Sequence, residues 1–307
     1  MPIDLSVVVG SVASERSIRD CLASVIASCA SVGAEVIVVD ASSDETASLV
    51  RRYFPAVKLI SLEPGTLTPV LWSTGIASAT GKRIATTTGH FVVPDSWARG
   101  LSAALDAGAT GAGGPVALRS AASLVDRAIY YLRYSAFLPT EARTVAEVSE
   151  IPGDNAMYER SVFEEHQSLL AGGFSEVALH RGMRAKGQRL VMVQSAAAEF
   201  GKSFPLALIS RHRFAHGRHF GAWRVSQTGI SASRIVIAAP AVPFVLLVRC
   251  ARRVLRGGRD LPGFLMAAPL ILWLAVCWAG GEALGAMQSG AGEVPAPDLE
   301  DARAHRD

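Results

Sequence analysis

A short apolar run that ends in an acidic residue constrains this chain more than any other feature. Residues 36–39 are Val-Ile-Val-Val, and Asp40 follows them at the start of a Ser/Asp-rich turn. An unbroken apolar run of this kind is typical of a parallel strand buried on both faces. Asp40 then lies at the carboxyl edge of the sheet, where open α/β sheets bind their ligands. The run at 5–10 has the same character, so the sequence predicts two adjacent strand ends and a nucleotide site.

Strand and helix patterns alternate through the first half of the chain. This alternation predicts right-handed crossovers and a doubly wound, mostly parallel α/β sheet. A Gly-rich link is expected over 108–114, and a polar connector is expected after residue 137. The expected strands cover 5–10, 35–39, 57–61, 83–87, 115–119 and 189–194, and the expected helices cover 16–31, 44–53, 67–80, 97–107, 121–137 and 175–187.

Positive charge is concentrated in the second half of the chain. The net charge is only +3, but residues 199–260 hold eleven Lys/Arg against two acids. Apolar runs flank this basic segment, and no recognition-helix pattern accompanies it, so it favours a membrane surface and argues against nucleic acid. The four cysteines have no metal-binding spacing and are expected to be reduced. The tail 289–307 is expected to be disordered.

Two apolar segments near the C-terminus predict a membrane location. Residues 261–281 are 21 residues without a charge, which is enough to cross a bilayer. Residues 235–248 are only 14 and contain two prolines, so they predict a short, re-entrant or interfacial segment, with a conventional two-helix hairpin as the alternative. Residues 211–224 mix arginine and histidine with aromatic residues, which is typical of an interfacial helix. The chain starts directly with a strand pattern, so we expect no signal peptide.

The order of these motifs resembles the family-2 glycosyltransferases of the GT-A fold. The resemblance is carried by SVASERS after the first strand, VVDASSDET around Asp40, SATGKRIATTTGHFVVPDSW at 78–97, and GDNAMYERSVF followed by GGFSEVALHRGMRAKGQRL. It covers about residues 3–195. It implies a transferase domain at 1–200, with a nucleotide-binding half at 1–118 and an acceptor half at 119–200. A basic interfacial region at 201–232 and membrane segments at 233–288 would follow.

The resemblance also implies a donor pocket at the first two strand ends. Ser11, Ala13 and Glu15 would line the base and ribose, and Asp40 would accept a hydrogen bond from the nucleoside. Such donors suit a buried carboxylate, because an unpaired buried charge is costly. The alternative for Asp40 is that it caps the following turn. Asp44 is a further candidate, although it also suits the N-cap of the next helix.

The sequence departs from the family pattern where a metal ion is usually bound. The family has Asp-x-Asp after the fourth strand, whereas this chain has Thr88, Gly89 and His90. Mg²⁺ prefers hard oxygen ligands, while Mn²⁺ accepts imidazole more readily. Three alternatives stay open for Thr88 and His90: contact with the donor phosphates, a divalent cation held by His90, or simple packing of His90 under Trp97. In a metal-free site, cationic side chains or backbone amides would neutralise the diphosphate.

Inverting transfer needs a carboxylate that deprotonates the acceptor hydroxyl. The family pattern places this base at Glu176, with Asp154 as the second candidate and Asn155 on the acceptor side. For Glu176 the alternative is a charge that simply favours a helix N-terminus. Arg218, in the basic segment, is the candidate for a contact with the donor diphosphate, and a solvated basic face is the alternative there.

Together these features predict a membrane-anchored, inverting glycosyltransferase on the cytoplasmic face of the inner membrane. Its donor would be a nucleotide-diphosphate sugar, which the resemblance implies is a UDP-sugar, and its acceptor would be a lipid-linked or other membrane-presented molecule. The main alternative is a catalytically degenerate scaffold of the same fold that binds nucleotide sugar or lipid. A nicotinamide-dependent oxidoreductase is disfavoured, because the turn after residues 5–10 lacks Gly-x-Gly-x-x-Gly.

Overall fold

The computed structural model describes residues 3–140, 145–170, 173–201, 205–257 and 260–289. By internal contacts the chain forms two units, one of residues 1–119 with 137–201 and the other of residues 120–136 with those from 202 onward. The predicted tail 289–307 lies outside the described residues, apart from Ser289. The first unit corresponds to the predicted transferase domain except for residues 120–136, which pack with the C-terminal helices.

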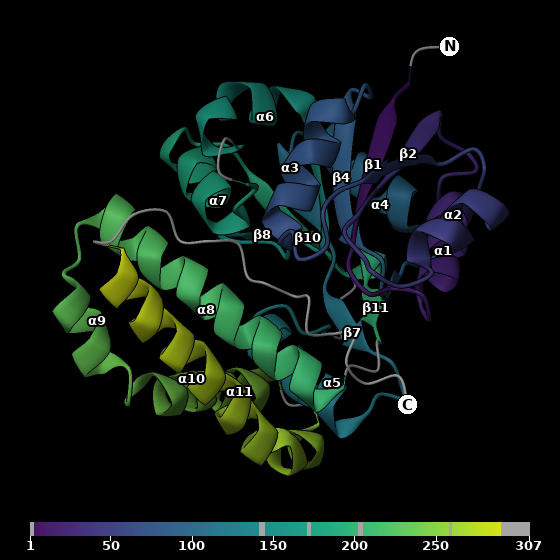
Figure 1. Ribbon diagram of the computed structural model, residues 1–307. Helices are drawn as coiled ribbons and strands as arrows, with labels where there is room; N and C mark the ends of the chain where they lie inside the picture. The colour runs from purple at the N-terminus through teal and green to yellow at the C-terminus, as the bar shows by residue number, and fades with distance from the viewer. Residues whose placement is uncertain (1–2, 141–144, 171–172, 202–204, 258–259, 290–307) are drawn as a thin grey trace. The chain divides into compact units, whose positions relative to one another are not determined.

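The first unit is built on an eight-stranded sheet in the order β3-β2-β1-β4-β9-β6-β10-β8, seen in Figure 1. The strands β3, β2, β1 and β4 are parallel, whereas β9 is antiparallel to both of its neighbours and β8 is antiparallel to β10. A small second sheet has the order β5-β11-β7. The strands are β1 (Leu5–Ser11), β2 (Ala34–Asp40), β3 (Lys58–Ser61), β4 (Arg83–Thr88), β5 (Phe91–Val92), β6 (Gly111–Gly113), β7 (Val116–Leu118), β8 (Val145–Val148), β9 (Asn155–Glu159), β10 (Leu190–Val193) and β11 (Ala198–Phe200).

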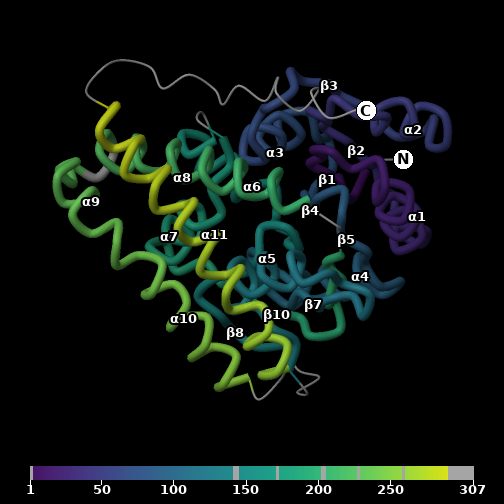
Figure 2. The backbone as a smooth tube through the Cα atoms, turned by 60° about the horizontal axis from the view of Figure 1, so that its bottom comes forward, coloured from purple at the N-terminus to yellow at the C-terminus, as the bar shows by residue number. Residues whose placement is uncertain are grey.

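Helices cover both faces of this sheet, which is expected because its central strands carry apolar residues on both faces. Every residue of β1 is buried. Figures 1 and 2 both show α3 on one face of β1 and β2, and α1 on the other. On the α3 side, Trp72, Phe174 and Tyr158 form edge-to-face ring contacts in the core. The helices of this unit are α1 (Ile18–Ser28), α2 (Thr46–Tyr53), α3 (Thr68–Ser78), α4 (Trp97–Asp106), α6 (Arg160–Glu165) and α7 (Glu176–Ala185).

The Gly-rich segment 108–114, predicted as a link, contains the buried strand β6. A Cβ atom on Gly111 would lie 2.7 Å from a methyl of Leu190 on β10 and 2.8 Å from the Tyr158 ring on β9. On Gly113 a Cβ atom would lie 2.6 Å from that of Ile151. Glycine therefore lets β6 pass between two strands that carry large side chains, although its composition resembles a loop.

The second unit consists of α5 (Leu124–Tyr134), α8 (Leu206–Thr228), α9 (Ala232–Ala238), α10 (Val242–Gly257) and α11 (Leu261–Gln288). Among the described residues, α11 is long and apolar enough to cross a bilayer, and the pair α9 and α10, bent by 65°, would qualify only if taken together. The arginines from 249 to 256 are in α10. They extend that helix well past the apolar residues because arginine is a good helix former.

Candidate active site

Three strand ends meet at one edge of the large sheet. In the register of the central strands, Ser11 on β1 pairs with Asp40 on β2, and Gly10 pairs with Thr88 on β4. The chain adds β2 and β3 on one side of β1 and then returns to add β4 on the other. The carboxyl ends of β1 and β4 therefore flank a topological switch point, the usual ligand position in such sheets. Of the predicted donor residues, Ser11, Asp40 and Thr88 end these three strands, and Ala13, Glu15 and His90 lie in the loops that follow β1 and β4.

Asp40 is a buried carboxylate at this edge. Its residue is only 2% exposed, and its Oδ1 accepts a hydrogen bond of 2.6 Å from the Ser42 hydroxyl. Burial raises the pKa of Asp40, while hydrogen bonds from Ser42 and Ser11 act in the opposite direction. A carboxylate in this position gains from any further N–H or O–H donor that a ligand provides.

The loop after β1 is tied to the loop after β2. Ala13 adopts a left-handed backbone conformation with φ of 47°, which is rare for a residue with a side chain. Such strain persists where the surroundings fix it, and it is common at functional sites. Three backbone N–H groups of the loop donate to side chains after β2: Ala13 to Ser42 (2.9 Å), Ser14 to Thr46 (3.1 Å) and Glu15 to Asp44 (3.3 Å).

Asp44 has a structural role at the start of α2. Its Oδ1 accepts from the N–H of Thr46 at 3.0 Å, and its Oδ2 accepts from Glu15. The N-cap of α2 is Glu45, without a side-chain cap bond, so Asp44 is not the N-cap expected from the sequence; its bond to Thr46 belongs to the turn just before the helix. Asp44 thus joins the two loops beside Asp40, and its charge also raises the pKa of Asp40, as the smallest of the contributions to the shift.

Residues 88–90 complete the edge. The N–H of Gly89 donates to the carbonyl of Gly10 at 2.9 Å, and a Cβ atom on Gly89 would lie 2.9 Å from the Ser14 hydroxyl oxygen. Glycine therefore allows this turn to pack directly on the loop after β1. Thr88 Oγ1 and His90 Nε2 lie 3.2 Å apart. The His90 ring packs against those of Phe91 and Phe200, each with its centroid 5.7 Å away.

These residues are a poor match for a metal ion. Within the described residues, no group of three or more His, Cys, Asp or Glu side chains is placed to hold one. Thr88 and His90 together offer one hydroxyl and one imidazole, whereas Mg²⁺ requires an octahedral set of oxygen ligands. The residues present at the end of β4 therefore do not fit a resident Mg²⁺ ion, and a contact of His90 with Mn²⁺ stays a prediction.

The two predicted catalytic bases, Glu176 and Asp154, lie next to each other in the first unit. Glu176 is the first residue of α7, which Ser175 caps by accepting from the N–H of Ala178 at 3.4 Å. A Cβ atom on Gly153 would lie 3.3 Å from the Cβ and Cδ atoms of Glu176, so the glutamate packs on the 153–154 turn. Asp154, the next residue, is 2% exposed. The fold thus brings both candidates together.

The turn and the helix are each anchored to the central sheet. The Thr86 hydroxyl on β4 donates to the carbonyl of Gly153 at 2.8 Å. On α7, His180 Nε2 lies 2.8 Å from the Tyr158 hydroxyl on β9, and both side chains are buried. Burial lowers the pKa of His180 to about 4 and, together with the charge of Glu176, raises the pKa of Tyr158. This pair was not predicted, although a histidine four residues after Glu176 on one helix face was the available signal.

Asn155 has a different position from the one expected. It is fully buried, its Oδ1 accepts from Trp97 Nε1 at 2.6 Å, and its Nδ2 donates to the carbonyls of Pro115 (3.1 Å) and Ala196 (2.9 Å). Through these bonds the Asn155 side chain connects α4 to the segments that contain Pro115 and Ala196. The structure thus gives Asn155 a packing role, and its contact on the acceptor side stays a prediction.

Arg218 belongs to the second unit. It lies on α8, and its Nε donates to Gln288 Oε1 on α11 at 2.8 Å. Its predicted contact with the donor diphosphate would join the two units, so it stays a prediction.

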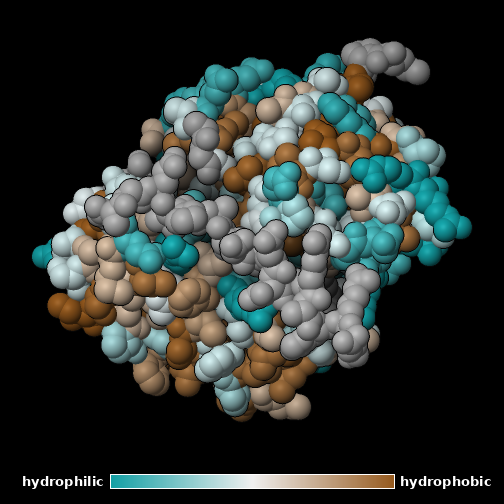
Figure 3. All heavy atoms as spheres, in the orientation of Figure 1, coloured by the Kyte–Doolittle hydropathy of each residue, from teal (hydrophilic) through white to brown (hydrophobic). Residues whose placement is uncertain are grey.

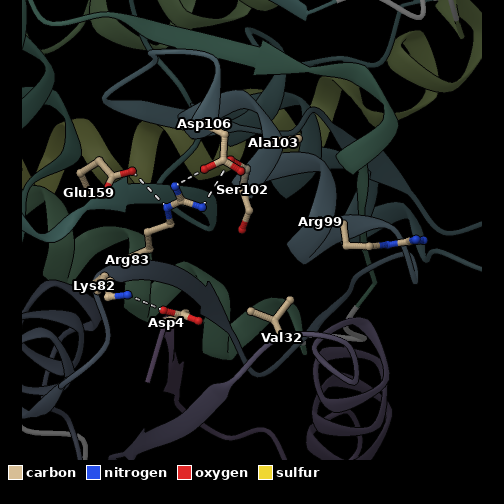
Figure 4. A pocket seen from close by; sticks show the side chains of 9 residues that line it. All are labelled: Asp4, Val32, Lys82, Arg83, Arg99, Ser102, Ala103, Asp106 and Glu159. Atoms are coloured by element: carbon tan, nitrogen blue, oxygen red, sulfur yellow. Dashed lines mark hydrogen bonds and ion pairs between the residues drawn. The ribbon is translucent and has the colours of Figure 1, made fainter. Parts of the chain in front are cut away.

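A cavity of about 470 Å³ lies at the opposite edge of the sheet, where β1 and β4 begin (Figure 4). In it Arg83 points toward Asp106 (2.5 Å) and Glu159 (3.0 Å), and Lys82 pairs with Asp4 at 2.9 Å. The cavity is thus lined by cations paired with carboxylates, and it contains none of the predicted site residues.

Comparison with known protein families identifies the family of this chain. The sequence profile of glycosyl transferase family 2 matches residues 6–167, which is more than half of the chain. The chain belongs to glycosyl transferase family 2. It is therefore a glycosyltransferase, and the GT-A fold predicted from the sequence is confirmed.

One solved structure of low sequence identity, with a TM-score above 0.5, shares this fold. A structure of Staphylococcus aureus TarS 1–349 in complex with UDP-GlcNAc has a TM-score of 0.51 at 13% identity, with 95% of this chain and 93% of that chain covered. Another structure of TarS 1–349 has a TM-score of 0.48 at 13% identity, covering 95% and 92%. GalNAc-T7 with UDP, GalNAc and Mn²⁺ has a TM-score of 0.48 at 14% identity; the match covers 66% of this chain but only 44% of that one. A search of curated proteins found no match.

Proposed function

We propose that this family-2 glycosyltransferase moves a sugar from a UDP-sugar donor to a membrane-presented acceptor, with inversion at the anomeric carbon. The assignment of the donor rests on one observation, the buried Asp40 at the switch point of the sheet. A carboxylate with a raised pKa, one hydroxyl partner in Ser42 and a ligand-binding edge beside it suits a nucleoside that donates N–H or O–H groups.

A UDP-sugar is the donor class that best agrees with the related fold. The TarS structure contains UDP-GlcNAc, and its match extends over nearly the whole of both chains. We assign the base and ribose to Ser11, Ala13, Glu15 and Asp40, and the region next to the phosphates to Thr88 and His90.

Glu176 is our candidate for the base, with Asp154 as the second. In the proposed reaction the carboxylate removes the proton from an acceptor hydroxyl while the resulting oxygen forms a bond to the anomeric carbon. The bond from that carbon to the diphosphate oxygen breaks on the opposite face, and nucleoside diphosphate leaves with the electron pair. Placement of Glu176 at the N-terminus of α7 favours its charged form before proton transfer.

The leaving diphosphate requires positive charge or N–H donors. Because the residues at 88–90 do not fit a resident Mg²⁺ ion, we assign no step to a metal. Arg218 is our candidate for the cation, and backbone N–H groups of the loops after β1 and β4 are the candidates for neutral donors.

The helices of the second unit support a membrane-presented acceptor. We propose that they attach the enzyme to the cytoplasmic face of the inner membrane, where a lipid-linked acceptor would be delivered in the plane of the bilayer. The apolar helix α11 is the feature that supports this attachment.

A thermal-shift panel tests the donor assignment. The full-length protein is incubated with UDP, GDP, CDP and ADP, because a ligand that binds only the native state raises its stability by mass action. We expect UDP to raise the midpoint most, and we expect this shift to be lost in Asp40→Ala. If another nucleotide raised the unfolding midpoint more than UDP does, the UDP assignment would be contradicted.

Turnover separates the enzyme from a binding scaffold that has lost its activity. UDP release from candidate donors should stop in Glu176→Gln while the UDP shift is kept. If wild type releases UDP no faster than Glu176→Gln with every donor and acceptor pair, the proposal of catalysis at this site fails.

A further inference from the structure

Helices α8 and α11 pack side by side through glycine (Figure 1). A Cβ atom on Gly217 would lie 2.2 Å from the carbonyl oxygen of Trp278, and one on Gly221 would lie 2.1 Å from that of Glu282. From the other helix, a Cβ atom on Gly281 would lie 2.0 Å from the Phe214 carbonyl oxygen. Each helix thus presents Gly-x-x-x-Gly to the other, which lets the two backbones touch.

The two helices run in the same direction in a fixed register. Trp273 Nε1 donates to the Ser210 hydroxyl at 2.9 Å near the start of the contact, and Arg224 forms an ion pair with Glu282 near its end. The residue numbers rise together along both helices. The stretch 210–224 of α8 therefore accompanies the stretch from Trp273 onward in α11.

This stretch of α8 is rich in cationic residues. Arg211, Arg213 and Arg218 lie within it, and the guanidinium carbon of Arg213 is 4.4 Å from the centre of the Trp278 ring. If α11 crossed a bilayer, these arginines would lie within the hydrocarbon core of the bilayer, because α8 packs along α11. Arginine is strongly disfavoured there. The packing of α8 on α11 is thus at odds with a transmembrane α11.

The start of α11 is also held by polar groups. Asp260, at its N-cap, accepts from the Tyr131 hydroxyl at 2.7 Å and from the Arg127 guanidinium at 3.0 Å. Both partners lie on α5, whose residues connect directly to the transferase unit at positions 119 and 137. Each end of α11 is therefore bound to a polar helix of the same unit.

One face of α9, α10 and α11 is apolar and exposed. Figure 3 shows brown, apolar side chains on the surface of these helices. Exposed arginines follow on α10 itself, which gives the surface a cationic border. The exposed apolar residues include Ile237, Phe244, Val245, Val248, Leu265 and Met266, and the exposed arginines of α10 are Arg249, Arg252 and Arg256.

We propose that the second unit binds the interface of an anionic lipid bilayer from one side and that α11 does not cross it. This inference deepens the membrane attachment in the proposed function and rests on it. The apolar face enters the boundary between headgroups and acyl chains, and the arginines of α10 meet lipid phosphates. Both ends of α11 then stay on the side of the transferase unit, in contrast to the span expected from residues 261–281.

Cysteine labelling in sealed vesicles of known orientation tests the topology. Full-length Arg256→Cys and Met287→Cys place an exposed thiol before and near the end of α11, and wild type with its own cysteines gives the background. A membrane-impermeant maleimide should label both positions from the same side, that of the transferase unit. Labelling of position 287 only from the opposite side would show that α11 crosses and would overturn the proposal. A protease-cleavable tag after Asp307 provides the same readout if either variant fails to fold.

Vesicle binding tests the cationic border. Arg249→Gln/Arg252→Gln/Arg256→Gln should weaken binding to phosphatidylglycerol vesicles on the order of 100-fold, because each arginine near an anionic surface contributes about a factor of five. The matched triple variant Arg51→Gln/Arg52→Gln/Lys58→Gln, in the transferase unit, should bind as wild type does. Equal loss in both triples, or no membrane binding by wild type, would overturn the proposal. Neither readout requires turnover, so a failure of the transferase assignment would be seen separately in UDP release.

Discussion

Glu176 packs directly on Gly153, with its Cβ and Cδ atoms 3.3 Å from the position that a Cβ atom of Gly153 would take. This contact holds the glutamate beside the turn that contains Asp154. Any side chain at position 153 would displace the carboxylate, so the glycine helps to define where the proposed base points.

The first prediction concerns this base. Glu176→Gln keeps the size of the side chain but removes the proton acceptor, so kcat should fall about 1000-fold while UDP affinity changes little. Asp154→Asn should reduce kcat less. The measurement is UDP release under saturating donor, with the exposed Glu63→Gln as the control. A larger loss in Asp154→Asn than in Glu176→Gln would reverse the two assignments.

We expect the charge of Asp40 to favour UDP binding and to destabilise the ligand-free fold. Because burial raises its pKa, the folded protein holds this proton more tightly than the unfolded chain does. The charged form therefore destabilises the ligand-free fold at neutral pH. Asp40→Asn should raise the melting midpoint by about 2 °C at pH 7 and bind UDP at least tenfold more weakly.

The pH dependence checks the cause of that effect. The stability difference between Asp40→Asn and wild type should shrink as the pH falls through the ordinary carboxyl pKa of 3.8, below which wild type is protonated in both states. A difference that is independent of pH would show that the charge of Asp40 is not its source.

Two neighbouring glycines of α11, Gly280 and Gly281, test the close contact between α8 and α11. Gly281→Ala places a methyl group 2.0 Å from the Phe214 carbonyl oxygen, whereas at neighbouring Gly280 the nearest atom is 3.7 Å away in the Phe214 ring. Gly281→Ala should lose about 3 kcal/mol, and Gly280→Ala should gain up to about 1 kcal/mol from helix propensity. Unfolding followed by tryptophan fluorescence measures both, and equal effects would contradict the close approach.

His180 should make the transferase unit sensitive to acid. Burial lowers its pKa from 6.5 to about 4, so between these values the unfolded chain binds a proton that the folded protein does not. The free energy of unfolding should therefore fall as the pH is lowered from 6.5 to 4. His180→Gln should flatten this slope in chemical unfolding, and the exposed His219→Gln should leave it unchanged. An identical slope in both variants would remove His180 as the cause.

Chelation tests the poor fit of residues 88–90 to a cation. Because Thr88 and His90 supply one hydroxyl and one imidazole, EDTA should change UDP affinity less than twofold. Titration calorimetry with and without Mn²⁺ is the measurement. A tenfold gain with Mn²⁺ that disappears in His90→Ala would establish a metal site at His90.

The central strands were predictable because their physical signal is local. Residues 36–39 are apolar on both faces, and the strand ends at Asp40 in the sequence and in the structure alike. Strand β1 has a similar apolar run at Val7–Val9, whereas β4 ends in three threonines and was expected from its place in the alternating pattern. Glu176 and Asp154 stay predictions as catalytic bases, and only the fold shows that they are neighbours.

Other parts of the fold depend on contacts that are distant in sequence. Strand β6 consists of Gly-Ala-Gly and is a strand only because β9 and β10 flank it. Asn155 looked like a ligand contact, yet its partners Trp97, Pro115 and Ala196 come from three separate segments. The α8–α11 pairing depends on glycines whose role is visible only when both helices are present.

The position of α5 has a practical consequence for anyone preparing this enzyme. Tyr130, Tyr131 and Tyr134 are buried, and Tyr131 stacks edge-on against Phe264 of α11 and bonds to its N-cap. Cutting the gene after residue 201 would strip these rings of their partners while leaving them inserted in the middle of the transferase sequence. The helices are thus not a removable tail, and a soluble fragment would need residues 120–136 redesigned as well.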